Sequence, residues 1–482
     1  MKKLILTTCM VALLAAPAMA QVDFTRYVAL GDSLTAGYAS GSSMDYYQQR
    51  AYPQLLATQA NGSFLQGPFI APPGYPSMMV LNGLPLSIGP SDMPPPYDPE
   101  VPESILNYFY NLALEEPYQN LGIVGATTYD LLTRTGNAIE LYGGNFENVR
   151  YDMVLRIPQQ PNPADPTELI DYTAMVAAIG QQPTFLTAWA GSNDVLGAVL
   201  AATPLDGVTM TPLDAFAQIY ATFIGGLATS LPNTDIVVLN IFSDARWIPF
   251  TTTLPIAVDV SGVGTVALMG EDGPLEAGDY LTLAGGSLLQ QGYGLPIAGS
   301  PPLPEDLDLG TGAPGVILRA AEIEIINERL AAVNGIIADV TAQFPNVHLF
   351  DITPLFTELV NGSFRTFGDI ELSTDFLTGG IFSYDGFHPQ NVGQAVLAGA
   401  LIDYINDEFN DNIPQLNMYE ILNEGGWDAA SPFAAICGGC DPKDVVMTED
   451  AFKQLYEAIL PDLAARWKQP RQERQTHTSS VD

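Results

Sequence analysis

The chain has 482 residues, of which 47% are hydrophobic and only 15% are charged. Its 54 acidic and 17 basic side chains give a formal net charge of −37 at pH 7. This balance argues against nucleic acid as a partner and against tight binding to anionic membrane surfaces, because both require clustered positive charge. It is typical of a protein kept soluble outside the cell, or of one adapted to a saline habitat.

The first 20 residues have the pattern of a secretory signal peptide. Lys2 and Lys3 form a positive n-region, Leu4–Ala16 an apolar stretch, and Ala18–Ala20 an A-x-A cleavage site. The apolar stretch is too short to span a bilayer, and no later stretch of the sequence is long and apolar enough to do so. Cleavage removes two lysines and no acid, which takes the formal charge from −37 to −39. We therefore expect an exported protein, periplasmic or extracellular, without a membrane span.

Five short runs beyond this leader are typical of strands. They are Arg26–Leu30, Leu121–Val124, Thr184–Ala188, Ile236–Ile241 and Val347–Phe350. The last four are largely apolar with little alternation, as in strands that are covered on both faces. Helical patterns separate several of them, at Tyr52–Thr58, Leu213–Leu231, Ile317–Phe344 and Val392–Phe409. Strands that alternate with helices predict an α/β fold with a central parallel sheet between two helical layers.

Two long segments interrupt this alternation. Residues 61–102 are rich in Pro and Gly, with apolar side chains scattered through them. Residues 243–314 show short β-like runs at Thr265–Met269 and Tyr280–Leu283 between glycine turns. Long insertions at strand ends of open α/β folds usually border the functional site. We therefore expect both insertions at its rim, the alternative being that they only pack on one another.

The C-terminal stretch forms a third segment outside the alternation. It contains helical patterns at Gln415–Leu422 and Ala451–Trp467, followed by a polar tail. We predict a signal peptide at residues 1–20, an α/β domain at residues 21–409 and a helical extension at residues 410–482.

Ser33 stands where the first predicted strand ends in a turn of small residues, in the sequence GDSL of residues 31–34. A serine hydroxyl is a weak nucleophile at neutral pH and needs a base within hydrogen-bond reach. Taken alone, such a serine fits the N-cap of a helix equally well. The G-x-S-x-G nucleophile elbow occurs nowhere in the sequence, which argues against an ordinary α/β-hydrolase.

Only three histidines could serve as that base: His348, His388 and His477. His348 lies in an apolar strand-like run, and His477 lies in the polar tail. His388 remains, three residues after Asp385 in a sequence of turn-forming residues. A carboxylate that accepts a hydrogen bond from the second ring nitrogen fixes the imidazole tautomer. We predict Ser33 as nucleophile, His388 as base and Asp385 as the orienting acid.

Four sequence blocks together resemble the GDSL family, also called SGNH hydrolases after their Ser, Gly, Asn and His. GDSL at residues 31–34 is similar to the first block, NLGIVGAT at 120–127 to the second, GSND at 191–194 to the third, and DGFHP at 385–389 to the fifth. The blocks stand in family order across most of the chain. The resemblance implies a three-layer, flavodoxin-like α/β/α fold and ester hydrolysis without a cofactor.

The resemblance also implies an oxyanion hole made of the backbone N–H of Ser33, the backbone N–H of Gly125 and the side-chain amide of Asn193. Acyl transfer develops negative charge on the former carbonyl oxygen, so donors must point at it. Glycine at 125 leaves room for substrate to approach the backbone. A plain turn at Gly125 and a helix cap at Asn193 are compatible with these roles. We assign Asp32 and Asp194 to the structure of the loops and not to the triad.

Two cysteines, Cys437 and Cys440, remain after the leader, and in an exported protein they predict a disulfide. A redox-active C-x-x-C and half of a metal site are the other interpretations. The first lacks a strand-to-helix context, and the second lacks further cysteine or histidine ligands. No EF-hand spacing, P-loop or dinucleotide fingerprint is present, so we expect neither a metal nor a cofactor.

We expect an exported serine esterase that acts on small or lipid-like esters through an acyl-enzyme. The alternatives are a polysaccharide O-acetyl esterase and a non-catalytic ligand-binding protein on the same fold. Phe64, Phe69, Met78 and Met79 in the insertion at residues 61–102 favour acyl chains longer than acetyl. Tyrosines in and near the same insertion favour sugar rings. The sequence does not indicate an oligomeric state.

Overall fold

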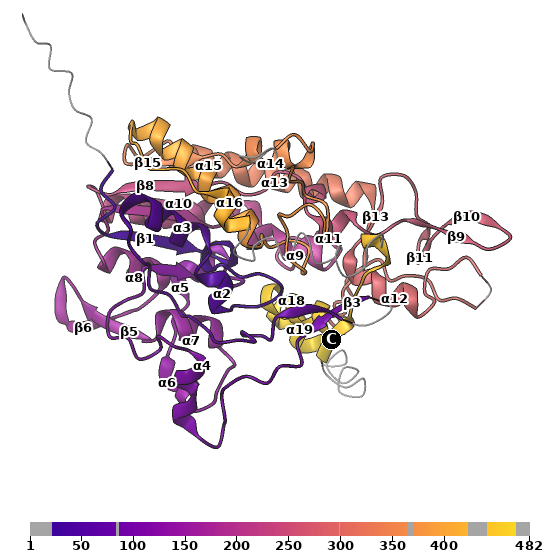
Figure 1. Ribbon diagram of the computed structural model, residues 1–482, viewed down its shortest axis with the longest axis horizontal. Coiled ribbons are helices and arrows are strands. Elements are labelled where there is room, and N and C mark those ends of the chain that lie inside the picture. Colours follow the sequence, from indigo (N-terminus) through magenta and orange to yellow (C-terminus); the bar gives the residue numbers. More distant parts are fainter. Residues whose placement is uncertain (1–21, 83–85, 298, 365–370, 423–440, 469–482) are drawn as a thin grey trace, which may run out of the picture.

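The structure is a computed structural model that describes residues 22–82, 86–297, 299–364, 371–422 and 441–468. The predicted signal peptide and the pair Cys437 and Cys440 lie outside these residues. A sheet with its helices forms one side of the molecule, and a β-hairpin projects from the other (Figure 1). Within the described ranges, no helix is long and apolar enough to cross a membrane.

Five parallel strands form the central sheet. In chain order they are β1 (Tyr27–Gly31), β4 (Asn120–Gly122), β7 (Phe185–Trp189), β8 (Asp235–Leu239) and β15 (Val347–Phe350). Their order across the sheet is β15-β8-β7-β1-β4. The chain passes from β4 over β1 to β7, which is the flavodoxin-like order and brings the loops after these three strands together. The predicted strands are therefore confirmed as members of one parallel sheet.

Helices cover both faces of this sheet, as the sequence predicts. Side chains at odd positions of β1, Tyr27 and Ala29, pack with α3 (Tyr52–Asn61) and α15 (Asn391–Phe409). Val28 and Leu30 face the other layer, which contains α10 (Leu213–Ser230) and α13 (Ala320–Thr341). Side chains of a strand alternate between its two faces, so the sheet is buried on both. The three-layer α/β/α fold is confirmed.

The long helices of the second layer show why this packing is stable. On α10, Phe216, Tyr220, Phe223 and Leu227 recur at intervals of three and four residues, and all are fully buried. This spacing puts them on one helix face. Truncation of a buried phenylalanine such as Phe223 to alanine would cost about 3–5 kcal/mol.

Three predicted helices differ from those observed, and the one predicted over Gln415–Leu422 is shortened to α16 (Met418–Ile421). Ile317 and Leu318 do not begin the helix predicted over Ile317–Phe344, because they form β14 and pair with β13 (Tyr280–Leu281). The pattern Ala451–Trp467 is divided into α18 (Glu449–Ile459) and α19 (Pro461–Lys468). Proline is favoured in the first turn of a helix and disfavours helical backbone at the residue before it, which explains the division.

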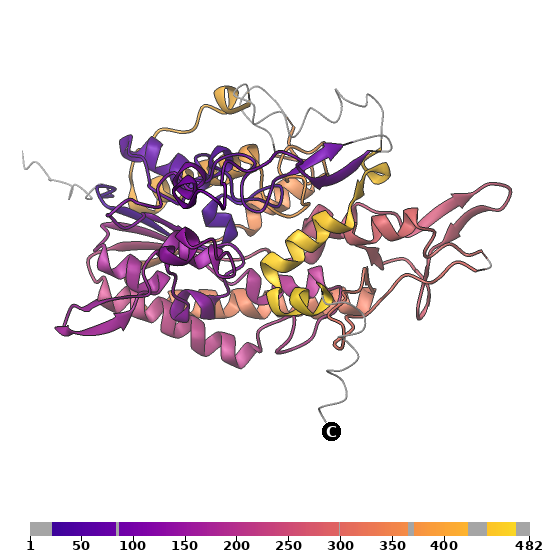
Figure 2. The ribbon, with the colours of Figure 1, turned by 90° about the horizontal axis from the view of Figure 1, so that it is seen from below.

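Segments far apart in the sequence meet beside the C-terminal helices. β2 (Met79–Asn82) and β3 (Ser87–Pro90) form an antiparallel pair, and β16 (Val446–Met447) adds to β3 in parallel. A hairpin of β9 (Ala257–Val260) and β10 (Gly264–Ala267) makes the projecting arm. Figure 2 shows α18 and α19 in yellow between the central sheet and this arm.

Shorter elements complete the described part of the chain. The helices are α1 (Ser33–Ala36), α2 (Asp45–Gln48), α4 (Ile105–Tyr108), α5 (Thr128–Thr133), α6 (Ala138–Tyr142), α7 (Val149–Leu155), α8 (Ala174–Gly180), α9 (Asn193–Leu200), α11 (Pro249–Thr252), α12 (Gly286–Gln290), α14 (Thr353–Val360) and α16 (Met418–Ile421). The strands are β5 (Gln159–Asn162), β6 (Asp165–Asp171), β11 (Met269–Gly270) and β12 (Gly273–Pro274). Several of these helices begin at the carboxyl edge of the sheet, where the candidate site lies.

Candidate active site

Three predicted site residues follow the carboxyl ends of neighbouring strands. Ser33 is the first residue of α1 and is separated from β1 by Asp32 alone, and Gly125 lies in the turn after β4. Asn193 is the first residue of α9, after β7. Its side-chain Nδ2 donates to the carbonyl oxygen of Ala126 at 2.9 Å, so the amide lies against the turn that contains Gly125. The strand order thus brings together residues that are far apart in the sequence.

His388 contacts Ser33, although 355 residues separate them. The His388 Nε2 atom lies 2.9 Å from Ser33 Oγ, and Nδ1 lies 2.9 Å from Asp385 Oδ2. All three side chains are buried, with at most 3% of their surface exposed. An imidazole in this position can take the hydroxyl proton while the carboxylate fixes its orientation.

Asp385 is held as an acceptor by its own loop and by the N-terminal part of the chain. Its carboxylate accepts the backbone N–H of Phe387, His388 and Gly41, at 3.0, 2.8 and 3.0 Å respectively. Burial alone raises the pKa of Asp385, but the His388 imidazole and the backbone donors outweigh burial and hold it below its usual value. The group is therefore ionised at neutral pH and can stabilise an imidazolium.

Asp32 is equally buried, but its pKa moves in the opposite direction. Burial raises the pKa of Asp32 to about 7 despite the hydrogen bond from the Leu34 backbone N–H, and the nearby Asp194 adds to the rise. Asp32 caps α1, while Asp194 accepts from the Thr128 backbone and from the hydroxyls of Thr128 and Thr211. Both carboxyl groups therefore hold loops in place, which is the role that we predict for them from the sequence.

Gly125 adopts a positive φ of +72°, which favours glycine. A Cβ at this position would collide with the carbonyl oxygen of Ala458, in the last turn of α18. Room for substrate was the reason that the sequence suggested for this glycine. The structure provides another reason, because the C-terminal helix packs directly on the turn.

An apolar cavity, here called the Ser33 cavity, opens at Ser33 and His388. Its wall is mostly aromatic and aliphatic, and includes Leu196, Phe242, Ile248, Phe356, Phe382 and Phe387. Ile248 belongs to the insertion at residues 243–314, which we expect from the sequence to lie at the rim of the site. Most of the other lining residues follow β7, β8 and β15 or belong to the His388 loop.

The insertion at residues 61–102 does not supply the apolar wall that the sequence suggested. Among the described residues, none of its side chains lines the Ser33 cavity. Met79 and Phe69 are buried elsewhere, and Phe64 is half exposed. Their apolar character serves the packing of the insertion, including the small sheet of β2, β3 and β16.

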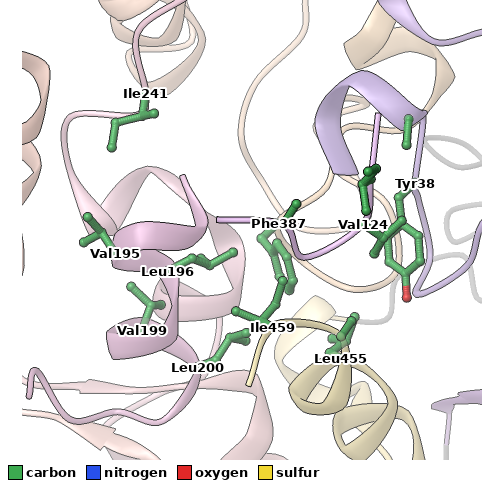
Figure 3. Close-up of a cluster of buried hydrophobic side chains, with 14 of the residues drawn as sticks. Tyr38, Val124, Val195, Leu196, Val199, Leu200, Ile241, Phe387, Leu455 and Ile459 are labelled. Carbon is green, nitrogen blue, oxygen red and sulfur yellow. The ribbon is translucent and has the colours of Figure 1, made fainter. Parts of the chain in front are cut away.

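The C-terminal helix α18 is the part of the site that sequence reasoning missed. Figure 3 shows Phe387, the neighbour of His388, beside Leu196 of α9 and Ile459 of α18, with Leu455 further along the same helix. Phe452, Leu455 and Ile459 recur at helical spacing and form a buried face. That pattern could have indicated a packed helix, but not the surface on which it packs.

His348 lies in β15, where its Nδ1 is 2.9 Å from Glu408 Oε1 on α15 and its ring packs on Phe409. This is the structural role expected for a histidine of a strand. His477 lies outside the described residues. In the ranges that the structure covers, no three His, Cys, Asp or Glu side chains form a group able to hold a metal ion.

A flavodoxin-like sheet with serine, histidine and aspartate gathered at its carboxyl edge defines a protein of the acyl-hydrolase class. The sequence model of the family described as GDSL-like Lipase/Acylhydrolase matches residues 27–401, and the chain therefore belongs to this family. Comparison with curated protein sequences gave no match. Family membership supports hydrolysis of ester bonds in general.

Proposed function

We propose that the protein is an exported serine esterase that hydrolyses esters of extended acyl chains through an acyl-enzyme. The observation that carries the proposal is the 2.9 Å contact between Ser33 Oγ and His388 Nε2, at the edge of an apolar cavity. A nucleophile and a base at this distance, with a third group orienting the base, form the arrangement that activates a serine.

In the proposed reaction, Ser33 attacks the ester carbonyl while His388 takes its proton and later gives it to the leaving alcohol. Asp385 stabilises the imidazolium. The backbone N–H groups of Ser33 and Gly125 and the amide of Asn193 donate to the developing oxyanion. The Asn193 Nδ2 atom donates to the carbonyl oxygen of Ala126 at 2.9 Å and to Asp32 Oδ2 at a longer 3.5 Å, and the second, weaker hydrogen bond is the one that a substrate oxyanion would replace.

The lining of the Ser33 cavity supports an acyl chain as the part of the substrate next to Ser33. Phe242, Phe356 and Phe382 offer apolar surface that cannot hydrogen-bond to sugar hydroxyls. Each buried methylene contributes about 0.8 kcal/mol of transfer free energy. Several methylenes in this cavity would therefore raise kcat/KM well above that of the acetyl ester.

A polysaccharide O-acetyl esterase is the second candidate, because an aromatic cavity lies close to the site. This Arg150 cavity is lined by residues that include Tyr38, Tyr75, Phe146, Arg150, Gln454 and Glu457. The rings of Tyr75 and Phe146 stack with centroids 5.6 Å apart. Such rings suit sugars, but neither Ser33 nor His388 lines this cavity. The buried contact between Ser33 and His388 also counts against a merely ligand-binding protein.

The test combines covalent labelling with a substrate series. A fluorophosphonate probe followed by peptide mass spectrometry should label Ser33, and kcat/KM should rise from p-nitrophenyl acetate toward longer acyl esters. Failure to label Ser33 would contradict the serine mechanism. A maximum at acetate, with release of acetate from acetylated xylan, would favour the second candidate.

Export through residues 1–20 belongs to the same proposal, as do the domain boundaries at residues 21–409 and 410–482. Protein recovered from the periplasm or medium should begin at Gln21 when its N-terminus is sequenced. Retention of Met1 in cell-associated protein would contradict it.

A further inference from the structure

Arg150, on α7, joins two backbone segments that meet at the proposed oxyanion hole. Its Nη1 atom donates to the carbonyl oxygen of Val124 at 3.2 Å and also to the carbonyl oxygen of Ala458. Val124 stands in the turn after β4, and Ala458 in the last turn of α18. One cationic group is therefore shared between the turn and the C-terminal helix.

The contact with Val124 matters because its carbonyl and the Gly125 N–H belong to one peptide unit. A trans peptide is planar, and its C=O and N–H point in opposite directions. A donor that fixes the Val124 carbonyl therefore also fixes the direction of the Gly125 N–H. A positive charge at the carbonyl oxygen polarises the same unit, which makes its N–H a stronger donor.

Helix α18 is tightly fitted at this point. A Cβ on Gly125 would meet both the carbonyl oxygen of Ala458 and the guanidinium of Arg150, so the three groups are in close contact. One turn earlier, Gln454 donates to the Gly41 carbonyl at 2.7 Å, and the N–H of Gly41 donates to Asp385. The helix thus supports the oxyanion side and the acid side of the site together.

We propose that Arg150 is a positioning residue for the oxyanion hole, and that the last turn of α18 completes its binding by accepting the second hydrogen bond. Arg150 acts through the Val124–Gly125 peptide and does not touch the reacting atoms. The inference rests on the proposed esterase function. It assigns a role in transition-state stabilisation to a side chain that belongs to none of the sequence motifs.

The test compares Arg150→Met with Arg156→Met, a matched control on the residue that follows the same helix. Arg156 also donates to two backbone carbonyls, those of Leu114 and Glu116, and packs over Tyr118, but it is not in the site. Loss of a direct oxyanion donor lowers kcat by about 100- to 1000-fold. Because Arg150 acts indirectly, we expect Arg150→Met to lower kcat by about 10- to 100-fold.

Three readouts separate positioning from a merely structural role. With active enzyme counted by fluorophosphonate titration, the KM of Arg150→Met should stay within about threefold while kcat falls. The inhibition constant of an alkyl boronic acid, which forms a tetrahedral adduct with serine, should rise by the same factor as kcat/KM falls. Arg156→Met should change neither by more than about threefold.

Arg150→Lys covers the case in which the methionine variant does not fold. Lysine keeps the charge but not the fork of donors, so we expect a smaller loss of kcat, about three- to tenfold. The proposal would be overturned if Arg150→Met, or Arg150→Lys where the methionine variant does not fold, had an unchanged kcat. It would also be overturned if only the KM of that variant increased. If Ser33→Ala retained turnover, the esterase mechanism itself would fail, and that result is distinct from full activity in the Arg150 variants.

Discussion

The Ser33 cavity and the Arg150 cavity are close neighbours with opposite chemistry. The first is almost wholly apolar and contains Ser33 and His388, whereas the second carries aromatic, cationic and acidic groups. Tyr38 lines the second cavity, and its ring packs on that of His388 at 4.8 Å between centroids. On the proposed function, chemistry and acyl binding take place in the Ser33 cavity, while groups that line the Arg150 cavity hold parts of the site in position.

The largest expected effect tests whether the reacting groups belong to the Ser33 cavity. Ser33→Ala and His388→Ala should each lower kcat/KM by about 10⁴-fold or more, because each removes a member of one proton-transfer unit. Asp385→Asn should cost less than loss of the histidine. His348→Gln is the control and should retain most activity, since its ring is committed to Glu408. Steady-state kinetics of the purified variants measure these effects. A Ser33→Ala enzyme that still turned over substrate would contradict the assignment of the reacting groups to the Ser33 cavity.

A second effect concerns the buried carboxyl groups of Asp32 and Asp385. The pKa of Asp32 is raised to about 7 in the fold, so the folded state binds this proton more tightly than the unfolded state. The free energy of unfolding should therefore fall as pH rises from about 4 to 7, by on the order of 4 kcal/mol at most. Asp32→Asn should remove this dependence in urea unfolding followed at several pH values.

Asp385 should affect the pH dependence of the free energy of unfolding in the opposite direction to Asp32. The pKa of Asp385 is held below its usual value in the folded protein. Its contribution to the free energy of unfolding is therefore fully present at pH values above its pKa in the unfolded chain, and it is lost as pH falls through its pKa in the folded protein. In the Asp385→Asn variant, the free energy of unfolding should therefore fall less steeply below about pH 4 than in the wild type. Its dependence on pH near pH 6 should be unchanged. Identical profiles for wild type and both variants would show that these carboxyls do not titrate as their surroundings predict.

A smaller effect sharpens the assignment of the acyl chain to the Ser33 cavity. Leu196→Phe narrows that cavity, so the best p-nitrophenyl ester should become shorter, with kcat/KM for long chains falling about tenfold. Phe146→Leu changes the Arg150 cavity and should leave the chain-length profile as it is. The reverse result, a shift with Phe146→Leu alone, would place the acyl chain in the other cavity.

The smallest effect is expected from Cys437 and Cys440, which lie outside the described residues. In exported protein they should form a disulfide that is not needed for catalysis. Intact mass after alkylation, with and without prior reduction, tests the bond, and activity after reduction tests the second point. Alkylation of both thiols without reductant would exclude the disulfide.

The sequence predicted the sheet well because each strand is a local, largely apolar run. It also predicted Ser33, Asp385 and His388 as site residues from recognisable motifs, and the structure brings their side chains into contact. Loops after neighbouring parallel strands meet at one edge of a sheet, so motif order was sufficient to predict a common site.

The sequence could not predict contacts that depend on segments without a motif. Arg150 is one arginine among several, and only the fold places it between Val124 and Ala458. The apolar side chains of residues 61–102 were misassigned because composition does not reveal which surface they cover. The boundary at Ile317 was misplaced since tertiary pairing with Tyr280–Leu281 prevailed over helical pattern, whereas Pro461 was a readable signal for the division of the last helix.

The packing of Ala458 against Gly125 has a consequence for biosynthesis. Proteins are made from the N-terminus, so Ser33 and Gly125 emerge early, while His388 and the last turn of α18 emerge near the end. A nascent chain therefore holds its proposed nucleophile long before its proposed base and the support of its proposed oxyanion hole. On the proposed mechanism, hydrolysis would begin only after His388 has been synthesised, and full activity would require the last turn of α18 as well.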